Sequence, residues 1–239
     1  MTQTIETAVI LAAGRGTRLQ PYTFDIPKGF MPVGDERLIE RSVRVLKENG
    51  IKNIIIGTGH LHEHYEKFAE ENGLTTFLSP DFATTGSFHT LIYGSELIKG
   101  DFLLLESDLL YHSDAIKRLL SAESKDVILC SGFTQSNDEV YVEIKDGNLS
   151  NLSKKKEQLK SVDAELVGIW KISLELLEKL KAHHLKAEDA RNKDYEVAVA
   201  QLSIEHTVNV LKIDNLAWCE IDNQAHLERA KKDILPKLD

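Results

Sequence analysis

Two carboxylate pairs are among the features of this sequence with the clearest chemistry. Residues 106–108 read Glu-Ser-Asp after the apolar run FLLL, and residues 220–222 read Glu-Ile-Asp after Ala-Trp-Cys. Alternate side chains of an extended chain share a face, so each pair presents two carboxylates to the same side. Mg²⁺ prefers such oxygens and typically takes one or two carboxylates from a protein. The alternative is that each pair lies in a surface loop or caps a helix.

A glycine-rich loop is the second chemical feature. Residues 10–19 read ILAAGRGTRL, a strand that ends in small residues and a tight turn. Gly14 and Gly16 carry no Cβ, so their amides can approach a polyphosphate closely. Arg15 and Arg18 add forked donors that suit phosphate oxygens. A plain strand–helix turn is the alternative; the Walker A pattern and the third glycine of a dinucleotide fingerprint are both absent.

These motifs need a scaffold that brings distant strand ends together. Short apolar runs alternate with helical patterns along the first half of the chain: runs at 7–11, 54–56, 75–78 and 102–105, and helices at 38–49, 62–72, 87–98 and 113–122. Apolar strands separated by helices predict a parallel sheet covered on both faces, whose ligands bind beyond the carboxyl ends of the strands. Residues 14–18, 57–60 and 106–108 follow such ends, which predicts one shared site.

The second half has a different pattern. An Asp-Gly turn at 146–147 joins the runs 140–145 and 148–153, which predicts a hairpin. The remaining expected elements are strands at 126–133, 165–172, 208–213 and 217–221 and helices at 174–185, 194–204 and 224–234. No linker rich in Pro, Gly or Ser divides the chain. We therefore expect one α/β domain over residues 1–239, with a doubly wound front (1–125) and a mixed, partly antiparallel rear (126–239).

Composition excludes several classes of protein. Among 239 residues, 29 Lys and Arg stand against 38 Asp and Glu, a net charge of −9 that disfavours nucleic acid and anionic membranes as partners. No apolar run approaches the roughly 18–20 residues that span a bilayer, and the N-terminus lacks the pattern of a signal peptide. Cys130 and Cys219 lie in strand-like runs outside any CxxC motif, which is typical of reduced, buried thiols in a cytoplasmic protein.

A longer signature extends the glycine loop. Residues 25–41 read DIPKGFMPVGDERLIER, which places Lys28, after a proline, ten residues beyond Arg18. Together these stretches resemble the L-A-A-G-x-G-[TS]-R-L…P-K signature of the nucleotidyltransferase superfamily, of the MobA-like and sugar-phosphate type. The resemblance covers essentially the whole chain. It implies a Rossmann-like fold with a nucleotide-binding front and an acceptor-binding rear. It also implies that an acceptor oxygen attacks the α-phosphorus of a nucleoside triphosphate, without a covalent enzyme intermediate.

The same resemblance implies roles for individual residues. Arg18 and Lys28 would be catalytic cations at the reacting phosphates, and Asp108 and Asp222 would hold Mg²⁺. Glu106 stands where many relatives carry an aspartate, which leaves its role open. The nucleotide-binding candidates are Leu11, Ala12, Ala13, Gly14, Arg15, Gly16, Thr85, Gly86, Ser87, Glu106 and Ser107.

The expected nucleotide is CTP. Residues 84–87 read TTGS, where some uridylyl and thymidylyl transferases carry a Gln and L-G-T-A. With PKGFMPVG, IIIGTGH and LLLESDLLY, the loop looks closest to the cytidylyltransferase branch that handles phosphocholine and 2-aminoethylphosphonate. The hydroxyls of Thr85 and Ser87 would bond the cytosine. Alternatively, Ser87 only caps the helix that follows it.

The expected acceptor is a small zwitterion. Its phosphorus end needs cations, and its amine end needs carboxylates or aromatic rings. Choline favours an aromatic cage, whereas a primary amine favours carboxylates. Since only 7 % of residues are aromatic, we expect 2-aminoethylphosphonate, with phosphocholine or a sugar 1-phosphate as alternatives. The acceptor-binding candidates are Ser131, Lys156, Glu165, Asp194, Tyr195 and Glu196, of which Tyr195 and Glu196 rest on the resemblance.

Further alternatives stay open. A regulatory nucleotide-binding domain would keep the fold without the chemistry, but such domains often lose the carboxylates or the lysine, and all four of Arg18, Lys28, Asp108 and Asp222 are present. A homodimer and a fusion to a second enzyme domain are equally compatible with the sequence. The histidines at 60, 62 and 64 suit an exposed helix start better than a metal site.

Overall fold

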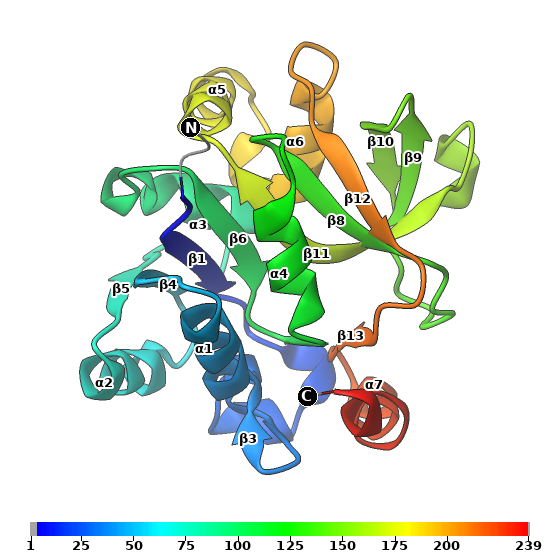
Figure 1. Cartoon of the computed structure of the whole chain (residues 1–239). Helices are drawn as coiled ribbons and strands as arrows, with labels where there is room; N and C mark the ends of the chain where they lie inside the picture. The colour runs from blue at the N-terminus through cyan, green and yellow to red at the C-terminus, as the bar shows by residue number, and fades with distance from the viewer. Residues whose placement is uncertain (1–3, 239) are drawn as a thin grey trace.

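The computed structural model describes residues 4–238 (Figure 1). The first half of the chain forms a parallel sheet. Its four strands are parallel, in the order β5-β4-β1-β6. They are β1 (Thr7–Ala12), β4 (Asn53–Thr58), β5 (Thr75–Leu78) and β6 (Phe102–Glu106). The helices that alternate with them are α1 (Leu38–Glu48), α2 (His62–Asn72), α3 (Ser87–Tyr93) and α4 (Asp114–Ser121).

The second half extends the same sheet. The full nine-stranded order is β5-β4-β1-β6-β11-β8-β12-β10-β9. The new strands are β8 (Val127–Ser131), β9 (Tyr141–Lys145), β10 (Asn148–Ser153), β11 (Ala164–Ile172) and β12 (Asn209–Ile213). β11 is buried along its whole length and lies antiparallel between β6 and β8. The prediction of an α/β fold with a mixed, partly antiparallel rear is therefore confirmed.

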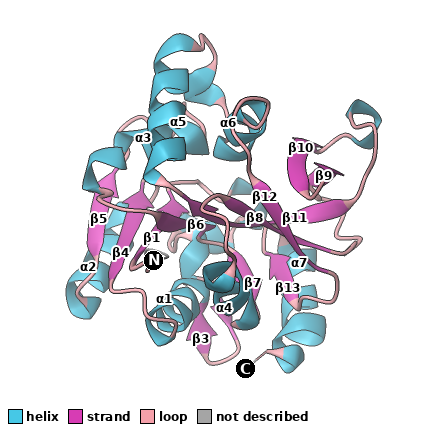
Figure 2. Cartoon of the chain, turned by 45° about the horizontal axis from the view of Figure 1, so that its top comes forward, coloured by secondary structure: helices cyan, strands magenta, loops and turns pink. Residues whose placement is uncertain are grey.

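Helices cover both faces of this sheet (Figure 2). On one face, Val9 and Leu11 of β1 share a core with α3 and with the helices α5 (Leu174–Lys186) and α6 (Tyr195–Leu202). On the other face, Ala8 and Ile10 pack with α1, α2 and α4. The strict alternation along β1 is what a strand between two helical layers requires, and it explains the continuous apolar run in the sequence.

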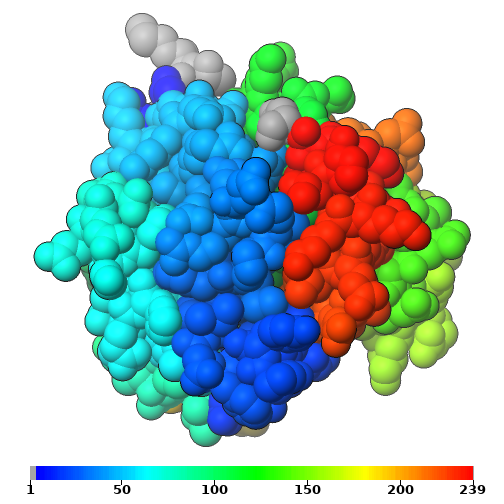
Figure 3. Space-filling view, turned by 90° about the horizontal axis from the view of Figure 1, so that it is seen from below, coloured from blue at the N-terminus to red at the C-terminus, as the bar shows by residue number. Residues whose placement is uncertain are grey.

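A smaller sheet attaches the C-terminal segment. β13 (Trp218–Glu220) pairs antiparallel with β7 (Leu109–Tyr111), so Glu220 lies opposite Leu109. The amide of Ile221 donates to the carbonyl of Asp108 at 3.1 Å. Beyond it, α7 (Gln224–Arg229) and a π-helical turn (Ala230–Ile234) pack on Leu19, Met31 and neighbouring residues, and Figure 3 shows this red segment beside the blue N-terminal part. The two carboxylate pairs thus meet at one place.

Several element boundaries differ from those expected. The predicted helix 87–98 ends at Tyr93, and after Gly94 the chain forms a short 3-10 helix at Ser95–Leu97. The predicted strand 126–133 covers only Val127–Ser131, and the predicted terminal helix changes from α7 to the π turn at Ala230. The strand β7 and the hairpin strands β2 (Pro32–Val33) and β3 (Glu36–Arg37) were not expected.

Other expectations are confirmed. Asp146 and Gly147 both have positive φ (51° and 77°), as the tight hairpin turn between β9 and β10 requires. Cys130 and Cys219 are buried free thiols. Over residues 4–238, no helix has the length and apolar character needed to cross a bilayer.

Candidate active site

A cavity of about 420 Å³ opens at the carboxyl ends of β1 and β6, between the two halves of the sheet. Most of the residues that the sequence selected line it: Leu11, Ala12, Ala13, Gly14, Gly16, Arg18, Lys28, Thr85, Gly86, Ser87, Glu106, Ser107, Asp108, Glu165, Asp194, Glu196 and Asp222. Arg15 is exposed outside this lining. Residues 57–60 also lie outside it, because they support the glycine loop from behind: the amide of His60 donates to the carbonyl of Ala13 at 3.1 Å.

The glycine loop is held in one conformation. Gly16 has φ +58°, and a Cβ there would lie 3.1 Å from the methyl group of Thr23. The hydroxyl of Thr23 donates to the carbonyl of Gly16 at 2.7 Å. By contrast, a Cβ on Gly14 would meet nothing within 4 Å. The backbone is therefore fixed at Gly16, whereas the space beside Gly14 is open. This is the conformation expected of a loop that binds phosphates.

Lys28 lies at the centre of the acidic groups. Its ammonium forms ion pairs with Asp108 and Asp222 and lies 3.8 Å from Glu220 Oε1. Only 13 % of its side chain is exposed. Burial on its own would lower the pKa of Lys28, but the charges of these three carboxylates outweigh it and raise that pKa well above its usual value. Lys28 is therefore a fixed positive charge at the mouth of the glycine loop.

Arg18 forms ion pairs with acidic residues on the outer side of the same cluster. One guanidinium nitrogen pairs with Asp138, and the other lies 2.9 Å from Asp222 Oδ1. Burial opposes ionisation of Asp222, yet a hydrogen bond from Glu220 and the charges of Lys28 and Arg18 hold the pKa of Asp222 well below its usual range. Asp222 is therefore a carboxylate shared by two cations.

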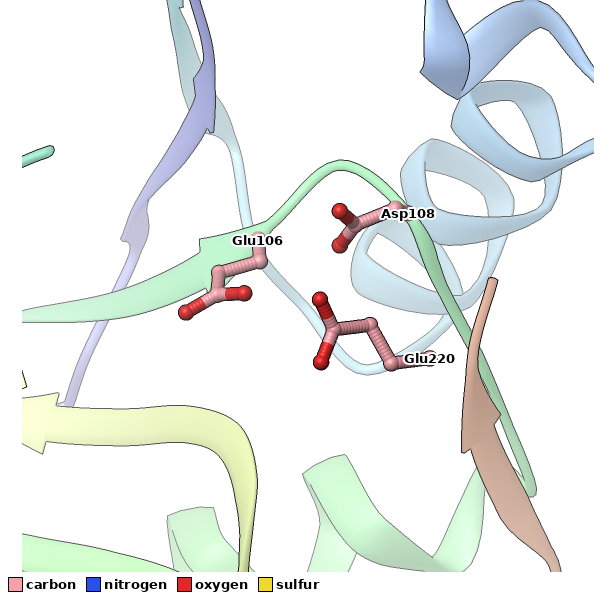
Figure 4. A group of neighbouring side chains, drawn as sticks. All are labelled: Glu106, Asp108 and Glu220. Carbon is pink, nitrogen blue, oxygen red and sulfur yellow. The ribbon is translucent and has the colours of Figure 1, made fainter. Parts of the chain in front are cut away.

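Three carboxyl groups, those of Asp108 and Glu220 beside Lys28 and that of Glu106, lie close together (Figure 4). Glu106 at the end of β6, Asp108 in the loop after it and Glu220 on β13 each place an oxygen within 4.8 Å of the other two. Asp108 Oδ1 is buried and has no hydrogen-bond partner among residues 4–238, and the same holds for Asp222 Oδ2. An all-oxygen, carboxylate-rich donor set with orphaned buried atoms fits a hard divalent cation. Glu220 belongs to the Glu-Ile-Asp pair noted in the sequence, in which the resemblance assigned the metal to Asp222 rather than to Glu220.

The loop before α3 is fixed to the rear half. The amide of Gly86 donates to the carbonyl of Arg191 at 2.7 Å, and a Cβ on Gly86 would lie 2.1 Å from the carbonyl oxygen of Lys193. The hydroxyl of Ser87 donates to Asp194 Oδ1 and accepts from the amide of Tyr195, both at 3.1 Å. Ser87 therefore bonds the start of α6, whereas the N-cap position of its own helix α3 is Gly86.

A family model described as "MobA-like NTP transferase domain" matches residues 8–201. The chain belongs to this family. The match spans the glycine loop, Lys28, the 106–108 carboxylates and the start of α6, so the predicted nucleotidyltransferase superfamily is confirmed.

Two relatives of this NTP transferase domain are named as transferases. The chain is 28 % identical over 233 residues to a "Bifunctional IPC transferase and DIPP synthase" of Thermococcus kodakarensis, with 96 % of this chain and 51 % of that protein covered. It is 25 % identical over 247 residues to a "CTP:phosphoglutamine cytidylyltransferase" of Campylobacter jejuni, with 92 % and 97 % covered. It therefore spans about half the length of the bifunctional relative and nearly all of the other.

Solved structures share the fold. The inositol-1-phosphate CTP transferase from T. maritima superposes with a TM-score of 0.82 at 16 % identity, and 98 % of this chain and 99 % of that chain are covered. At such low identity the likeness is a statement about the fold, and it agrees with the Rossmann-like sheet expected from the signature.

Acidic residues dominate the rear of the cavity in this NTP transferase domain. Glu196 is buried, and its Oε2 has no hydrogen-bond partner among the residues that the structure describes. Burial first, and the charge of Asp194 second, raise the pKa of Glu196 to about 7. Glu165 is also buried and accepts from the amide of Thr134 at 2.8 Å. The rear wall therefore offers carboxyl groups, one of them unsatisfied.

Three acceptor candidates lie outside the cavity lining. Ser131 is buried, and its hydroxyl donates to the carbonyl of Gly132 at 2.8 Å. Lys156 places its ammonium 4.5 Å from the ring centroid of Tyr141. Tyr195 is fully buried behind the wall, and its hydroxyl donates to Glu106 Oε1 at 2.9 Å. In these positions, the three side chains do not line the cavity in which the acceptor is expected to bind.

The cavity also contains residues that sequence reasoning missed. Lys154 lines it and lies 3.5 Å from Asp138 Oδ1, where it neighbours Arg18. Lys154 was visible only as the first of three consecutive lysines, a pattern typical of a solvated segment. Asp138 lies in a loop with no motif, so only the folded chain shows that it faces Arg18.

Proposed function

We propose that this chain is a Mg²⁺-dependent cytidylyltransferase that transfers CMP from CTP to 2-aminoethylphosphonate and releases pyrophosphate. The observation that carries the proposal is the position of Lys28, which lies between the glycine loop and a cluster of carboxylates. A transfer between two anions needs both of these: fixed cations for the phosphates and oxygen ligands for a divalent cation.

The proposed chemistry is a single in-line displacement. An oxygen of the acceptor forms a bond to the α-phosphorus of the nucleotide, and the bond from that phosphorus to the bridging oxygen breaks. Pyrophosphate leaves with the electron pair, so no group of the enzyme is covalently modified. Lys28 and Arg18 neutralise the charge that the phosphates bring, and the amides of Gly14 and Gly16 hold the triphosphate.

The proposed metal ligands come from the acidic cluster. Asp108, Glu106 and Glu220 can hold Mg²⁺ in the arrangement described. Asp222, the second ligand expected from the resemblance, pairs with Lys28 and Arg18 through Oδ1, and its buried Oδ2 has no hydrogen-bond partner among residues 4–238 and is available to the same cation. When bound, Mg²⁺ supplies positive charge at the phosphate oxygens. The protein supplies the rest through the orientation of these side chains.

CTP as the nucleotide is supported by the names of two similar proteins. The Campylobacter relative and the T. maritima structure are both named for CTP. The chain itself contributes the TTGS loop, in which Thr85, Gly86 and Ser87 line the cavity. Because Gly86 is packed against Lys193, this loop has little freedom to move away from a base.

A primary ammonium group as part of the acceptor is supported by the acidic rear wall. The unpartnered Oε2 of Glu196 can accept a hydrogen bond from such a group, and Asp194 adds negative charge beside it. A quaternary ammonium has no hydrogen to donate and favours aromatic rings. Tyr195, the aromatic residue expected at this place, lies behind the wall with its hydroxyl on Glu106. These contacts favour 2-aminoethylphosphonate over phosphocholine.

A pyrophosphate-release assay tests the proposal. CTP, UTP, dTTP and GTP are each combined with 2-aminoethylphosphonate, phosphocholine, inositol 1-phosphate and glucose 1-phosphate, with MgCl₂ or with EDTA. We expect CTP with 2-aminoethylphosphonate to be turned over several times faster than any other pair, and EDTA to abolish release. Equal or faster turnover of UTP or dTTP with a sugar phosphate contradicts the cytidylyl assignment. No release from any pair contradicts an enzymatic role.

A further inference from the structure

A buried chain of polar groups runs from β11 to the acidic cluster. The indole nitrogen of Trp170 on β11 donates to the hydroxyl of Tyr195 at 3.1 Å. That hydroxyl in turn donates to Glu106 Oε1 at 2.9 Å. Trp170 and Tyr195 are both fully buried, and their rings meet edge-to-face with centroids 5.8 Å apart. The Tyr195 phenol is therefore fixed by ring packing and by an accepted hydrogen bond, and its one proton is directed at Glu106.

Glu106 has particular need of such a partner. Its oxygen lies within 4.8 Å of oxygens of Asp108 and Glu220, so two acidic groups repel it toward other conformations. A glutamate side chain has three rotatable bonds, and ordering it costs entropy. The hydrogen bond from Tyr195 occupies Oε1 and leaves Oε2 for a cation. Metal-binding carboxylates are commonly oriented by a hydrogen bond of this kind, and its loss typically weakens metal affinity 10- to 100-fold.

The backbone of β11 makes room for this arrangement. Gly168 has φ +84°, and the register between β11 and β8 shifts around it, between Leu166 and Trp170. A Cβ at Gly168 would lie 3.5 Å from the carboxyl carbon of Glu106. The irregularity in β11 thus lies beside the carboxyl group that Tyr195 holds, and Trp170 follows it two positions later.

We propose that Tyr195 is a positioning residue of the metal site: it orients Glu106 toward Asp108 and Glu220, and Trp170 in turn orients Tyr195. The inference rests on the proposed function only in that this function needs a divalent cation. It assigns Tyr195 to the metal rather than to the acceptor, where the family resemblance had placed it. The identity of the nucleotide and of the acceptor does not enter it.

The test uses Tyr195→Phe, which removes the hydroxyl and keeps the ring. Trp170→Phe removes the donor to Tyr195 together with part of the buried indole ring. Tyr111→Phe is the matched control, since Tyr111 is a buried tyrosine outside the cavity lining. Binding of Mn²⁺ to the whole chain is measured from the EPR signal of free Mn²⁺, without nucleotide, because CTP itself chelates Mn²⁺. The Mg²⁺ concentration for half-maximal pyrophosphate release and the KM for each substrate are measured in parallel.

We expect Tyr195→Phe to weaken Mn²⁺ binding at least about tenfold and to raise the half-maximal Mg²⁺ concentration to match, with the KM for the acceptor changed less than twofold. Trp170→Phe is expected to act in the same direction with a smaller effect, and Tyr111→Phe to have none. A folded Tyr195→Phe protein with unchanged Mn²⁺ affinity overturns the inference, and so does a wild-type chain that binds no Mn²⁺. A rise in acceptor KM alone returns Tyr195 to the acceptor site. If metal binding changes as expected but CTP proves to be the wrong nucleotide, the proposed function fails while this inference stands.

Discussion

Ser87 and Asp194, 107 positions apart, share a hydrogen bond of 3.1 Å in which the serine hydroxyl is the donor. The same hydroxyl accepts from the backbone amide of Tyr195. One side chain thus connects the loop proposed to receive the base with the segment proposed to receive the acceptor. The two proposed substrate sites therefore share a wall, and we expect a change in one to affect the other.

Replacing this hydroxyl should affect both substrates. We expect Ser87→Ala to raise the KM for CTP and for the acceptor together, each about three- to tenfold, because the loop and the start of α6 lose their common anchor. Initial rates measured over both substrates test this. Ser203→Ala is the matched control, since that hydroxyl bonds only the carbonyl of Ala200 at the end of α6. A rise in KM for CTP alone would show that Ser87 acts on the nucleotide only.

Lys28 and a bound cation compete for the same carboxylates. In Lys28→Met, Asp108 and Asp222 lose the ammonium group with which both are paired. Breaking a buried pair by removing one partner typically costs about 3–5 kcal/mol, so we expect a lower Tm in the absence of metal. MgCl₂ should restore more of the Tm in this variant than in the wild type, while kcat falls by orders of magnitude. Thermal melts with and without MgCl₂ measure this; Lys52→Met, which removes an exposed pair with Glu6, is the control. An equal response to MgCl₂ in both proteins contradicts the competition.

Asp108 is expected to be indispensable for turnover. Asp108→Asn preserves the size of the side chain but removes the charge, and one of its oxygens is already orphaned in the fold. We expect kcat to fall at least about 100-fold, with a far-ultraviolet circular dichroism spectrum like that of the wild type. Asp114→Asn at the start of α4, whose carboxylate pairs with Arg118, should be nearly silent. Near-normal activity of Asp108→Asn would remove this residue from the site.

The raised pKa of Glu196 predicts that acceptor binding depends on pH. Its pKa is raised to about 7, so it is mostly protonated at pH 6 and mostly ionised at pH 8. An ammonium group prefers the ionised form, so the KM for the acceptor should fall as pH rises through 7. Glu196→Gln should remove this step; titration of the acceptor itself is common to both proteins. Parallel profiles in the two proteins would exclude Glu196 from the acceptor site.

The same pKa shift has a consequence for stability. The folded state binds the proton of Glu196 more tightly than the unfolded state does, since the usual pKa of a glutamate is near 4.5. The free energy of unfolding should therefore decline as pH rises from about 4.5 through 7. Urea denaturation at several pH values measures this decline, and it should be smaller in Glu196→Gln. An identical decline in both proteins would show that other groups cause it.

Local sequence patterns predicted the front of the fold well. β1 and β6 are apolar runs that end in recognisable motifs, and the turn at Asp146 has a backbone requirement that few residue pairs satisfy. The antiparallel insertion of β11 could not be predicted, because a strand buried on both faces has the same apolar pattern in either direction. β7, three residues long, is too short for any period to show.

Some residues of the candidate site could likewise be predicted from the sequence, and others could not. Residues within the glycine loop and the 106–108 motif could be selected because neighbours in sequence supply the pattern. The pair of Arg18 with Asp138 depends on how two loops fold over the cavity, and no spacing encodes it. Tyr195 shows a third case: the family resemblance placed it in the acceptor site, whereas its side chain is turned inward to Glu106. No local pattern gives the direction of this side chain.

The small sheet of β7 and β13 joins two parts of the site that lie far apart in the sequence and are therefore synthesised at different times. Once the chain has been synthesised as far as Asp108, it contains the glycine loop and Lys28. It then contains all the basic residues of the front half that are proposed to bind phosphate. Glu220 and Asp222 emerge only when most of the chain has been made, and they enter the cluster through β13. A nascent chain therefore carries the glycine loop long before it carries the complete set of carboxylates, and we expect an unfinished polypeptide to be inactive in the proposed transfer.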